Sequence, residues 1–495
     1  MANQSRDHIW PKALRTALAA AVALTVAVPA ASAQYINRGP SIGNIGPRIS
    51  PSINIAPVVP SVRYSPNVTY TDDYDDAPRL RRQKPKLVRL PPGDPDGLLK
   101  TTTIKTASKA AGRNYVPKEL ILEITGNPTD AQIEALARKH RLTRVESQDF
   151  PLIGSRMFRW RINDSRSVET VARQVIAGGG VKTANPNFRF ALQQTVNPLA
   201  DASQYAIVKL RLTEAHTLSR GADVMIAVID SGIDPTHPEL AGAIAGSFDP
   251  LGGTTAFHSH GTGIAGAIAA HDRLMGSAPA ARILAVRAFG NAETGAESTS
   301  FVILKGLEFA AARGARIINM SFAGPRDALI ERSLAALNER GIVLVAASGN
   351  AGPKSPPLYP AADRNVIAVS ATDASDKLFP ASNRGKHIAI AAPGADVLLP
   401  SVDGKYQVAS GTSFAAAYVS GLAALMIERN PALKPSEVRD VLTRTAQDLG
   451  PPGRDDQFGA GKADAFGAVS AASATLANAS NRPLAGEAPG QPAVR

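Results

Sequence analysis

The sequence predicts an α/β fold whose doubly wound, mostly parallel sheet is covered by helices on both faces, preceded by a small α+β module. One observation is a series of short apolar runs that alternate with helical patterns over residues 204–470. A second is that these runs are apolar at consecutive positions, which is typical of parallel strands buried on both faces. A third is a change of pattern at residues 115–192, where strands alternate with two amphipathic helices.

Composition and charge narrow the classes of function. The chain has 495 residues, no cysteine and 5% aromatic residues. Lack of cysteine excludes disulfides, thiolate metal sites and a thiol nucleophile. The net charge of +12 is carried mainly by residues 34–203, whereas residues 204–470 are close to neutral. A nucleic-acid-binding fold would carry this charge on its folded part, so we expect no nucleic-acid partner.

The first 33 residues have the pattern of a secretory signal peptide. Lys12 and Arg15 precede an apolar run over residues 17–28, and Ala31-Ser-Ala33 follows as a cleavage motif. The run is shorter than the ~20 residues that a membrane span needs. We therefore expect signal removal, no membrane span in the mature protein, and a secreted or periplasmic location.

Residues 34–114 are predicted to be a disordered Pro/Gly-rich linker. An acidic cluster at residues 72–76 is followed by a basic cluster at residues 79–89. Such a composition buries too little apolar surface to offset the entropy of the chain.

Residues 115–192 predict a ferredoxin-like α+β module. Strand patterns are expected at residues 119–124, 155–162 and 181–191. Helical spacing is expected from Thr129 and over residues 167–176, and the glycines at 178–180 end the second helix. Two βαβ-like halves in so short a segment are typical of this fold.

Five buried strands are expected between residues 204 and 470, with helices between them. The helical patterns include residues 301–313 and 329–340, and a helix that is apolar nearly all round covers residues 415–427. The expected strands are residues 224–229, 282–286, 316–320, 342–346 and 366–370. In such sheets the working groups lie beyond the carboxyl ends of the strands.

Three segments at strand or helix ends carry residues suited to nucleophilic catalysis. Asp230 follows a strand in Asp-Ser-Gly-Ile-Asp, His260 opens a helix in His-Gly-Thr-Gly-Ile-Ala-Gly, and Ser413 begins another in Gly-Thr-Ser-Phe-Ala. A serine hydroxyl needs an adjacent base, an imidazole can be that base, and a carboxylate can orient it. Each motif alone could be a turn or a helix cap. Together they occur in the chain order Asp, His, Ser.

With these motifs, residues 204–469 resemble the subtilisin-like serine protease family, the subtilases. Weaker family-like stretches support the resemblance: Gly276-Ser-Ala-Pro279, Asn319-Met-Ser321, Tyr359-Pro-Ala361, Ala392-Pro-Gly394 and Phe458-Gly-Ala-Gly461. The resemblance implies a subtilisin-like fold and a serine endopeptidase. It also implies that residues 115–192 are an inhibitory propeptide, with Asn185-Pro-Asn187 in its closing strand.

The resemblance assigns roles to individual residues. Ser413 is expected to be the nucleophile, His260 the general base, and Asp230 the group that orients the imidazole. Asn350, in Ala346-Ala-Ser-Gly-Asn350, matches the family's oxyanion asparagine. Ser413 at a helix start also brings its own N–H and the positive helix end near the oxyanion.

The expected substrate-binding residues are Ser321, Phe322, Ala323, Gly324 and Leu358. Leu358 stands where the family often has a small residue at the pocket floor, and Ala323 replaces a usual glycine. We expect a shallow pocket for small or medium apolar side chains. Phe414 replaces a usual methionine, and Ala417-Tyr418 replaces a usual Pro-His, so helix packing is expected to differ while proton transfer is not.

Two other features near the triad motifs suggest weaker candidates. Gly261, Gly263 and Gly266 fit the G-x-G-x-x-G fingerprint of dinucleotide sites, but no buried strand precedes them and no acidic residue follows at the required distance. Their spacing instead predicts close packing of a helix behind His260. His237 and His258 do not open a predicted helix, so both are expected to be loop residues.

The sequence therefore predicts a self-processed secreted serine endopeptidase that acts on protein or peptide substrates and has its own propeptide as a partner. Maturation is expected near residues 193–203, the catalytic domain at residues 204–470, and a flexible tail at residues 471–495. No cofactor is expected for catalysis, and no calcium ligand set has diagnostic spacing. A non-peptidase binding protein on the same fold and an esterase with the same triad stay open.

Overall fold

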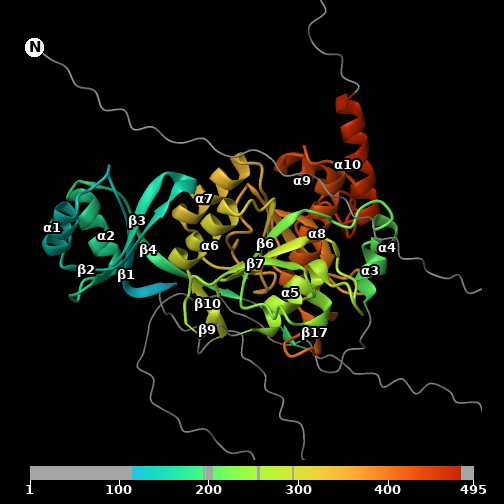
Figure 1. Ribbon diagram of the computed structural model, residues 1–495, viewed down its shortest axis with the longest axis horizontal. Coiled ribbons are helices and arrows are strands. Elements are labelled where there is room, and N and C mark those ends of the chain that lie inside the picture. The colour runs from blue at the N-terminus through green and yellow to red at the C-terminus, as the bar shows by residue number, and fades with distance from the viewer. Residues whose placement is uncertain (1–113, 193–194, 197–203, 254–256, 293–294, 481–495) are drawn as a thin grey trace, which may run out of the picture. The chain divides into compact units, whose positions relative to one another are not determined.

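The computed structural model describes residues 114–192, 195–196, 204–253, 257–292 and 295–480 (Figure 1). The chain divides into two units, residues 1–99 and 100–495, and all described residues belong to the second. The predicted signal peptide and all but the last residue of the predicted linker lie outside the described residues. So does most of the predicted maturation segment.

A seven-stranded parallel sheet forms the centre of the larger domain, in the order β15-β14-β13-β11-β6-β8-β7. Its strands are β6 (Met225–Asp230), β7 (Ile244–Phe248), β8 (Arg282–Arg287), β11 (Ile317–Met320), β13 (Val343–Ala347), β14 (Val366–Thr372) and β15 (Ile388–Pro393). Every neighbouring pair is parallel. The α/β fold with a mostly parallel sheet is thus confirmed, and β7 and β15 are additions to the five expected strands.

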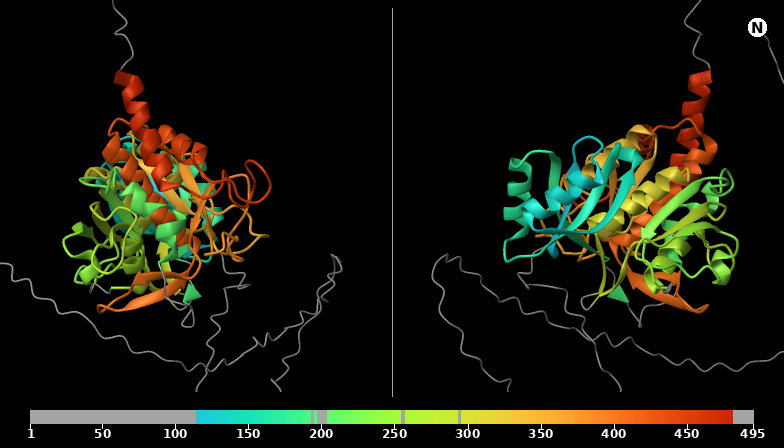
Figure 2. Two further views of the ribbon diagram at one scale, coloured as in Figure 1. Left: turned by 90° about the vertical axis from the view of Figure 1, so that its right-hand side faces the viewer. Right: turned by 60° about the vertical axis from the view of Figure 1, so that its left-hand side comes forward.

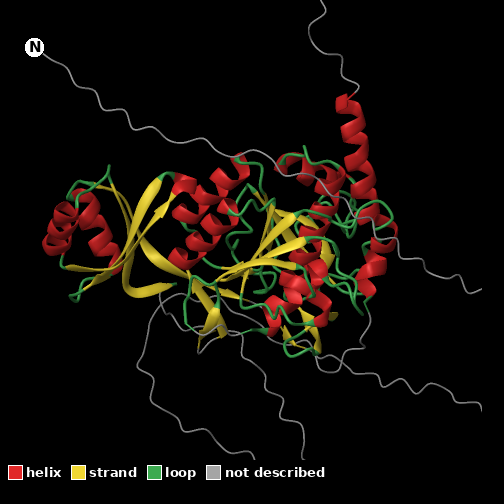
Figure 3. Cartoon of the chain, in the orientation of Figure 1, coloured by secondary structure: helices red, strands yellow, loops and turns green. Residues whose placement is uncertain are grey.

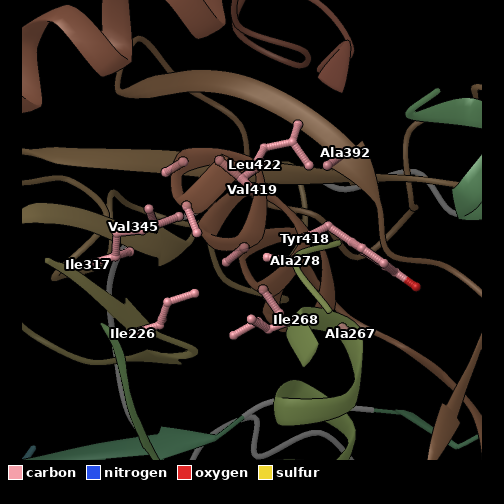
Figure 4. Packing of buried hydrophobic residues seen from close by; sticks show 14 of the residues in the cluster. Ile226, Ala267, Ile268, Ala278, Ile317, Val345, Ala392, Tyr418, Val419 and Leu422 are labelled. Atoms are coloured by element: carbon pink, nitrogen blue, oxygen red, sulfur yellow. The ribbon is translucent and has the colours of Figure 1, made fainter. Parts of the chain in front are cut away.

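Helices cover both faces of this sheet because its strands have apolar side chains on both sides (Figure 3). On β6, Ile226 and Val228 pack on one face, with helices α5 (Ser259–Ala269) and α8 (Thr412–Arg429). Ala227 and Ile229 pack on the other face, with α6 (Ser300–Ala312) and α7 (Ala328–Glu339). Figure 4 shows part of the first of these two cores.

Helix α8 lies inside the molecule and is buried from Thr412 to Ile427. It contacts α5, α10 (Ala465–Ser480) and the strands β11, β13, β14 and β15. Leu422 and Val419 face the sheet core in Figure 4, and the side chain of Tyr418 is also buried. Among the described residues, no helix combines the length and the hydropathy that crossing a membrane would need. The sequence-based assignment of α8 as a core helix agrees with this burial.

The small module has the six elements of a ferredoxin-like fold in the sheet order β2-β3-β1-β4, with antiparallel pairing throughout. Its elements are β1 (Tyr115–Ile124), α1 (Asp130–His140), β2 (Leu142–Phe150), β3 (Ser155–Ile162), α2 (Val168–Ala177) and β4 (Val181–Leu192). Thr129 and Gln132 form a capping box at α1. Sequence analysis did not predict β2. The core includes Leu120, Leu122, Trp160 and Val171.

Strand β4 joins the module to the larger domain. Its last residues pair antiparallel with β10 (Gly295–Thr299) on one side and with β12 (Phe322–Ala323) on the other. Ala191 lies opposite Glu297 on the first side and opposite Ala323 on the second. In Figures 1 and 2 the module lies next to α6 and α7. The strand therefore runs between two segments of the domain that contains β6 and α8.

A three-stranded sheet of β16 (Val397–Pro400), β17 (Tyr406–Ser410) and β5 (Thr195–Val196) leads into α8. In β5, Thr195 lies opposite Ser410, three residues before Ser413. The remaining elements are η1 (Pro151–Ile153), α3 (Tyr205–Lys209), α4 (Leu212–Ala215), η2 (Pro238–Leu240), β9 (Gly290–Ala292) and α9 (Pro435–Arg444).

The boundary predicted for the C-terminal tail is wrong by ten residues. Helix α10 continues to Ser480, whereas the tail was expected from residue 471. Ala472 is buried, and its carbonyl accepts a hydrogen bond from Asn430 at 3.3 Å. An alanine-rich segment forms helix readily, and here it also packs on α8 and α9. The rest of the predicted tail lies outside the described residues.

Candidate active site

Asp230 is the last residue of β6 and is completely buried. Its Oδ1 accepts hydrogen bonds from the N–H of Ser231 at 2.7 Å and from the hydroxyl of Ser231 at 3.1 Å. The same oxygen lies 2.7 Å from Nδ1 of His260. The carboxylate is therefore held by the turn that follows its own strand and faces the imidazole.

His260 is the second residue of α5 and is also completely buried. The start of α5 is fixed to the turn after β6, because the N–H of Gly261 donates to the Ser231 hydroxyl at 3.1 Å. A Cβ at Gly261 would lie 2.7 Å from the carbonyl oxygen of Ser231, so only glycine allows this approach. Since Nδ1 faces Asp230, Nε2 is the ring nitrogen left for chemistry, and it has no hydrogen-bond partner among the described residues.

The other glycines of the same motif serve packing. A Cβ at Gly266 would lie 2.1 Å from Cγ of Pro400, and one at Gly263 would lie 3.5 Å from the ring of Phe414. Helix α5 thus packs closely against β16 and the start of α8, as the glycine spacing predicts.

Ser413 is the second residue of α8, and 1% of its surface is exposed. Its hydroxyl donates a hydrogen bond to the carbonyl oxygen of Ser321 at 3.1 Å. The hydroxyl of Ser321 donates in return to the carbonyl oxygen of Ser413 at 3.0 Å. The ring of Phe414 lies 5.6 Å from that of His260, centroid to centroid, so the start of α8 lies beside the imidazole. The structure therefore places the start of α8, which carries Ser413, beside the pair formed by His260 and Asp230.

The side chain of Asn350 also faces the start of α8. Its Oδ1 accepts hydrogen bonds from the N–H of Thr412 at 3.0 Å and from the hydroxyl of Thr412 at 2.8 Å. The same hydroxyl accepts from the N–H of Gly349 at 3.1 Å. With Oδ1 fixed in this way, the amide nitrogen of Asn350 points away from Thr412. Sequence analysis named Asn350 but not Thr412, which orients it.

The expected substrate-binding residues lie along two neighbouring segments. Phe322 and Ala323 form β12, and Gly324 exchanges hydrogen bonds of 2.9 and 3.0 Å with Tyr359. A Cβ at Gly349 would lie 3.1 Å from Cδ1 of Leu358, so Leu358 lies beside the loop that carries Asn350. The structure thus brings Ser321, Gly324 and Leu358 into the same region as Ser413.

The side chain of Phe190 on β4 is buried next to this region. Its ring lies 5.9 Å from that of Phe322, and a Cβ at Gly324 would lie 2.2 Å from its Cδ1. Together with the pairing of Leu192 to Phe322, this contact means that the end of the module covers β12.

His237 and His258 lie in loops, as expected, but each of them also caps the helix that follows it. His258 is the N-cap residue of α5, and its Nδ1 accepts a hydrogen bond from the N–H of His260 at 3.1 Å. His237 caps η2 in the same way and is buried. Capping motifs commonly involve Ser, Thr, Asp or Asn, so an imidazole cap gives little sequence signal.

No group of three or more His, Cys, Asp or Glu side chains placed to hold a metal ion occurs within the described ranges. Glu239 illustrates a different use of a buried carboxylate. It accepts hydrogen bonds from the N–H groups of Asp272, Arg273 and Leu274 at 3.0 Å each, and from the Tyr406 hydroxyl at 2.8 Å. These bonds attach the loop after α5 to β17.

Comparison with known proteins agrees with this architecture. Residues 221–461 match the sequence profile of the subtilase family. Thermitase from Thermoactinomyces vulgaris is 32% identical over 285 residues, which covers 55% of this chain and 98% of thermitase. Subtilisin Savinase from Lederbergia lenta is 34% identical over 257 residues, covering 51% of this chain and 94% of Savinase. The chain covers only 38% of the minor extracellular protease Epr of Bacillus subtilis, at 36% identity over 248 residues.

A solved structure has the same fold. Fervidolysin from Fervidobacterium pennivorans, described as a keratinolytic enzyme related to subtilisin, superposes with a TM-score of 0.62 at 23% sequence identity. The match covers 72% of this chain and 61% of fervidolysin. Fold and sequence thus define the class, serine endopeptidases on a doubly wound α/β sheet. Within that class, this chain belongs to the subtilase family.

Proposed function

We propose that this chain is a secreted or periplasmic serine endopeptidase that hydrolyses peptide bonds with Ser413, His260 and Asp230. The observation that carries the proposal is the 2.7 Å contact between Asp230 and Nδ1 of His260, at a helix start that packs beside Ser413. The extracellular location rests on the signal-peptide pattern of residues 1–33.

The reaction begins when the Ser413 hydroxyl turns from the carbonyl of Ser321 toward Nε2 of His260. Nε2 takes the hydroxyl proton as Oγ bonds to the scissile carbonyl carbon, and the carbonyl oxygen becomes an oxyanion. Buried Asp230 holds the imidazole in the tautomer with Nδ1–H and stabilises the imidazolium. His260 then gives the proton to the leaving amine, and water releases the acyl group by the same steps in reverse order.

Asn350 and the N–H of Ser413 are the proposed oxyanion donors. The N–H of Ser413 belongs to the first turn of α8, where N–H groups have no acceptor within the helix. The fixed Oδ1 of Asn350 directs its amide nitrogen away from Thr412. Donors that are already oriented stabilise developing charge without reorganisation.

The module at residues 115–192 is proposed to inhibit the domain and to be removed by self-cleavage. Support comes from β4, whose residues 189–192 pair with β10 and β12 as an extended substrate would. Thr195 pairs with Ser410, close to the nucleophile in sequence. Leu192 pairs with the residue after Ser321, whose carbonyl oxygen accepts the hydrogen bond of the Ser413 hydroxyl. We therefore propose that the cleaved bond lies between Leu192 and Thr195.

Leu358 and Ala323 are proposed to limit the primary specificity pocket to small or medium apolar side chains. Leu358 lies beside the Gly349 loop and would occupy space at the pocket floor. Neither residue offers a charge to pair with a lysine, arginine or glutamate side chain of a substrate.

Fluorophosphonate labelling of the mature protein tests this function. We expect modification at Ser413, a new N-terminus between residues 193 and 195, and a peptide-library profile dominated by small or medium apolar residues before the cleaved bond. The Ser413→Ala precursor should stay full length and unlabelled. Trimming of purified Ser413→Ala precursor without added protease would argue against self-cleavage, and label on another residue would refute the assigned nucleophile. A profile dominated by Arg, Lys or Glu before the cleaved bond would contradict the proposed apolar pocket.

A further inference from the structure

His258 caps the helix that carries His260. Its Nδ1 accepts a hydrogen bond from the N–H of His260 at 3.1 Å. Its own N–H donates to the carbonyl of Gly232 at 2.8 Å, and its carbonyl accepts from the N–H of Thr262 at 3.1 Å and from the hydroxyl of Thr262 at 2.9 Å. The backbone of His258 is thus attached to the turn after Asp230 and to the first turn of α5, so its ring is held next to His260.

The cap requires the neutral form of His258. Because Nδ1 accepts a hydrogen bond, the neutral ring carries its proton on Nε2. A second proton would have to bind Nδ1, which would then be a donor facing the N–H of His260. Protonation therefore breaks the cap and adds a positive charge at the positive end of α5, where cations are unfavourable.

The titratable groups that act on His258 come from two elements: His260 on α5 and Asp230 on β6. Burial lowers the pKa of His258 below 6.5, the positive charge of His260 lowers it further, and Asp230 opposes both effects. A lowered pKa favours the neutral form in the folded protein. The stability that this form provides is present above pH 6.5 and is lost as the pH falls below it.

We propose that His258 is a positioning residue of the active site, and that a proton gained by its neutral ring disables the enzyme in addition to the proton gained by His260. In neutral form it fixes the main chain of His260 at the start of α5. In charged form it opposes the imidazolium that His260 becomes when it takes the proton from Ser413. This inference rests on the proposed function and assigns to it a second histidine.

The acid limb of the pH profile of kcat/KM on a peptide substrate tests the proposal. In the mature wild-type enzyme we expect the slope of log(kcat/KM) against pH to increase from one to two as the pH falls, because a second inactivating proton binds. His258→Asn keeps a good cap and has no charge to gain, so its limb should keep slope one. His258→Ala also loses the cap, and we expect its plateau kcat/KM to fall about tenfold, with most of the loss restored in His258→Asn.

A matched control is His271→Asn, because His271 follows the other end of α5 and its ring contacts the carbonyls of Ala269 and Ala241. Its limb should steepen as in the wild type. A wild-type limb of slope one throughout the range in which far-UV circular dichroism stays native would overturn the proposal. So would a two-proton limb in His258→Asn.

A second measurement does not depend on activity. In the Ser413→Ala precursor, NMR of labelled histidine should follow the titration of His258. Adding His260→Asn removes the charge that disfavours protonation, so the midpoint of His258 should move to higher pH. An unchanged midpoint would refute the coupling of the two histidines. Failure of the proposed peptidase would leave this comparison intact, so the two failures are distinguishable.

Discussion

Asn350 is oriented by a neighbour that belongs to another element. Thr412 binds its Oδ1 through both a backbone N–H and a hydroxyl, at 3.0 and 2.8 Å. Because Oδ1 is already held by hydrogen bonds, the amide group has no further rotational freedom to lose when its nitrogen donates to the oxyanion. This is the arrangement that an oxyanion donor needs.

Asn350→Ala should therefore lower kcat by about 10²–10³ and leave KM nearly unchanged, because the lost interaction is made in the transition state. Thr412→Val keeps the N–H contact and removes only the hydroxyl, so a smaller loss is expected. Steady-state kinetics on one peptide substrate compares the two. An Asn350→Ala enzyme whose KM rises at constant kcat would assign this residue to substrate binding instead.

At the scale of residues, the sequence predicted Asp230, His260 and Ser413 because each stands at the end of a strongly patterned strand or helix. It did not predict Ser231, Thr412 or the cap role of His258. Their importance depends on which polar groups a folded loop brings within hydrogen-bond distance, and a one-dimensional pattern contains no such distances. The role of Asn350 was predicted from the resemblance of its segment to a family motif. An asparagine after a glycine would not by itself have indicated that role.

Helix α8 is the element that connects the core to the proposed nucleophile. Sixteen of its residues are buried, and it packs on other elements through small side chains. At Gly421, a Cβ would lie 2.0 Å from the hydroxyl oxygen and 2.7 Å from Cβ of Ser277. The loop after α5 therefore approaches the backbone of α8 too closely for any larger residue.

Gly421→Ala should destabilise the protein by about 1–3 kcal/mol, because overpacking outweighs the helix propensity gained. Denaturant unfolding of the Ser413→Ala precursor, which cannot digest itself, measures the change. Adding Ser277→Ala removes the hydroxyl from the contact and should recover part of the loss. If the effects of the two substitutions on the free energy of unfolding simply added, the clash with Ser277 would not be the cause of the destabilisation.

At the scale of elements, buried strands and helices were predictable and edge or irregular strands were not. The five expected strands all occur, with ends that shift by one or two residues. Strand β2 was missed because a register shift between Arg144 and Glu146 interrupts its alternating pattern. Strand β7 was missed because it lies at the edge of the sheet, half-exposed, and lacks a continuous apolar run.

Across the whole molecule, charged contacts join the module to the larger domain. Glu123 on β1 is almost completely buried and accepts a hydrogen bond from Arg332 on α7 at 2.9 Å. Burial opposes the charge of Glu123, but hydrogen bonds from Ser155, Arg332 and Lys182 outweigh it and lower its pKa from 4.5 to about 2. The contact between ionised Glu123 and Arg332 is thus present above pH 4.5 and is lost as the pH falls toward 2.

Arg332→Gln in the Ser413→Ala precursor should raise the fraction of molecules with the module undocked about tenfold or more at pH 7, since a hydrogen bond to a charged group contributes about 1.5–3 kcal/mol. Hydrogen exchange of the β4 amides measures this undocked fraction. The difference from the parent should shrink at pH 3. Arg326→Gln is the control, because Arg326 pairs with Glu331 within the larger domain. Equal effects of the two substitutions would refute a specific role of the contact.

The sequence predicted both folded parts but not how they join. Pairing of β4 with β10 and β12 connects residues more than a hundred positions apart, and nothing in the alternation of β4 specifies its partners. The two flanking strands are short, so they give weak patterns of their own. Only the folded arrangement reveals that one strand belongs to both parts.

That shared strand belongs to the same polypeptide as the domain that the module is proposed to inhibit. While the chain is intact, the module meets β10 and β12 at an effective concentration in the millimolar range typical of short linkers. If the chain is cut between Leu192 and Thr195, as proposed, the same contacts would hold together two separate polypeptides, and their dissociation would follow mass action. A freshly processed sample would then gain activity upon dilution and lose it upon concentration. The protein concentration after release would therefore control the activity.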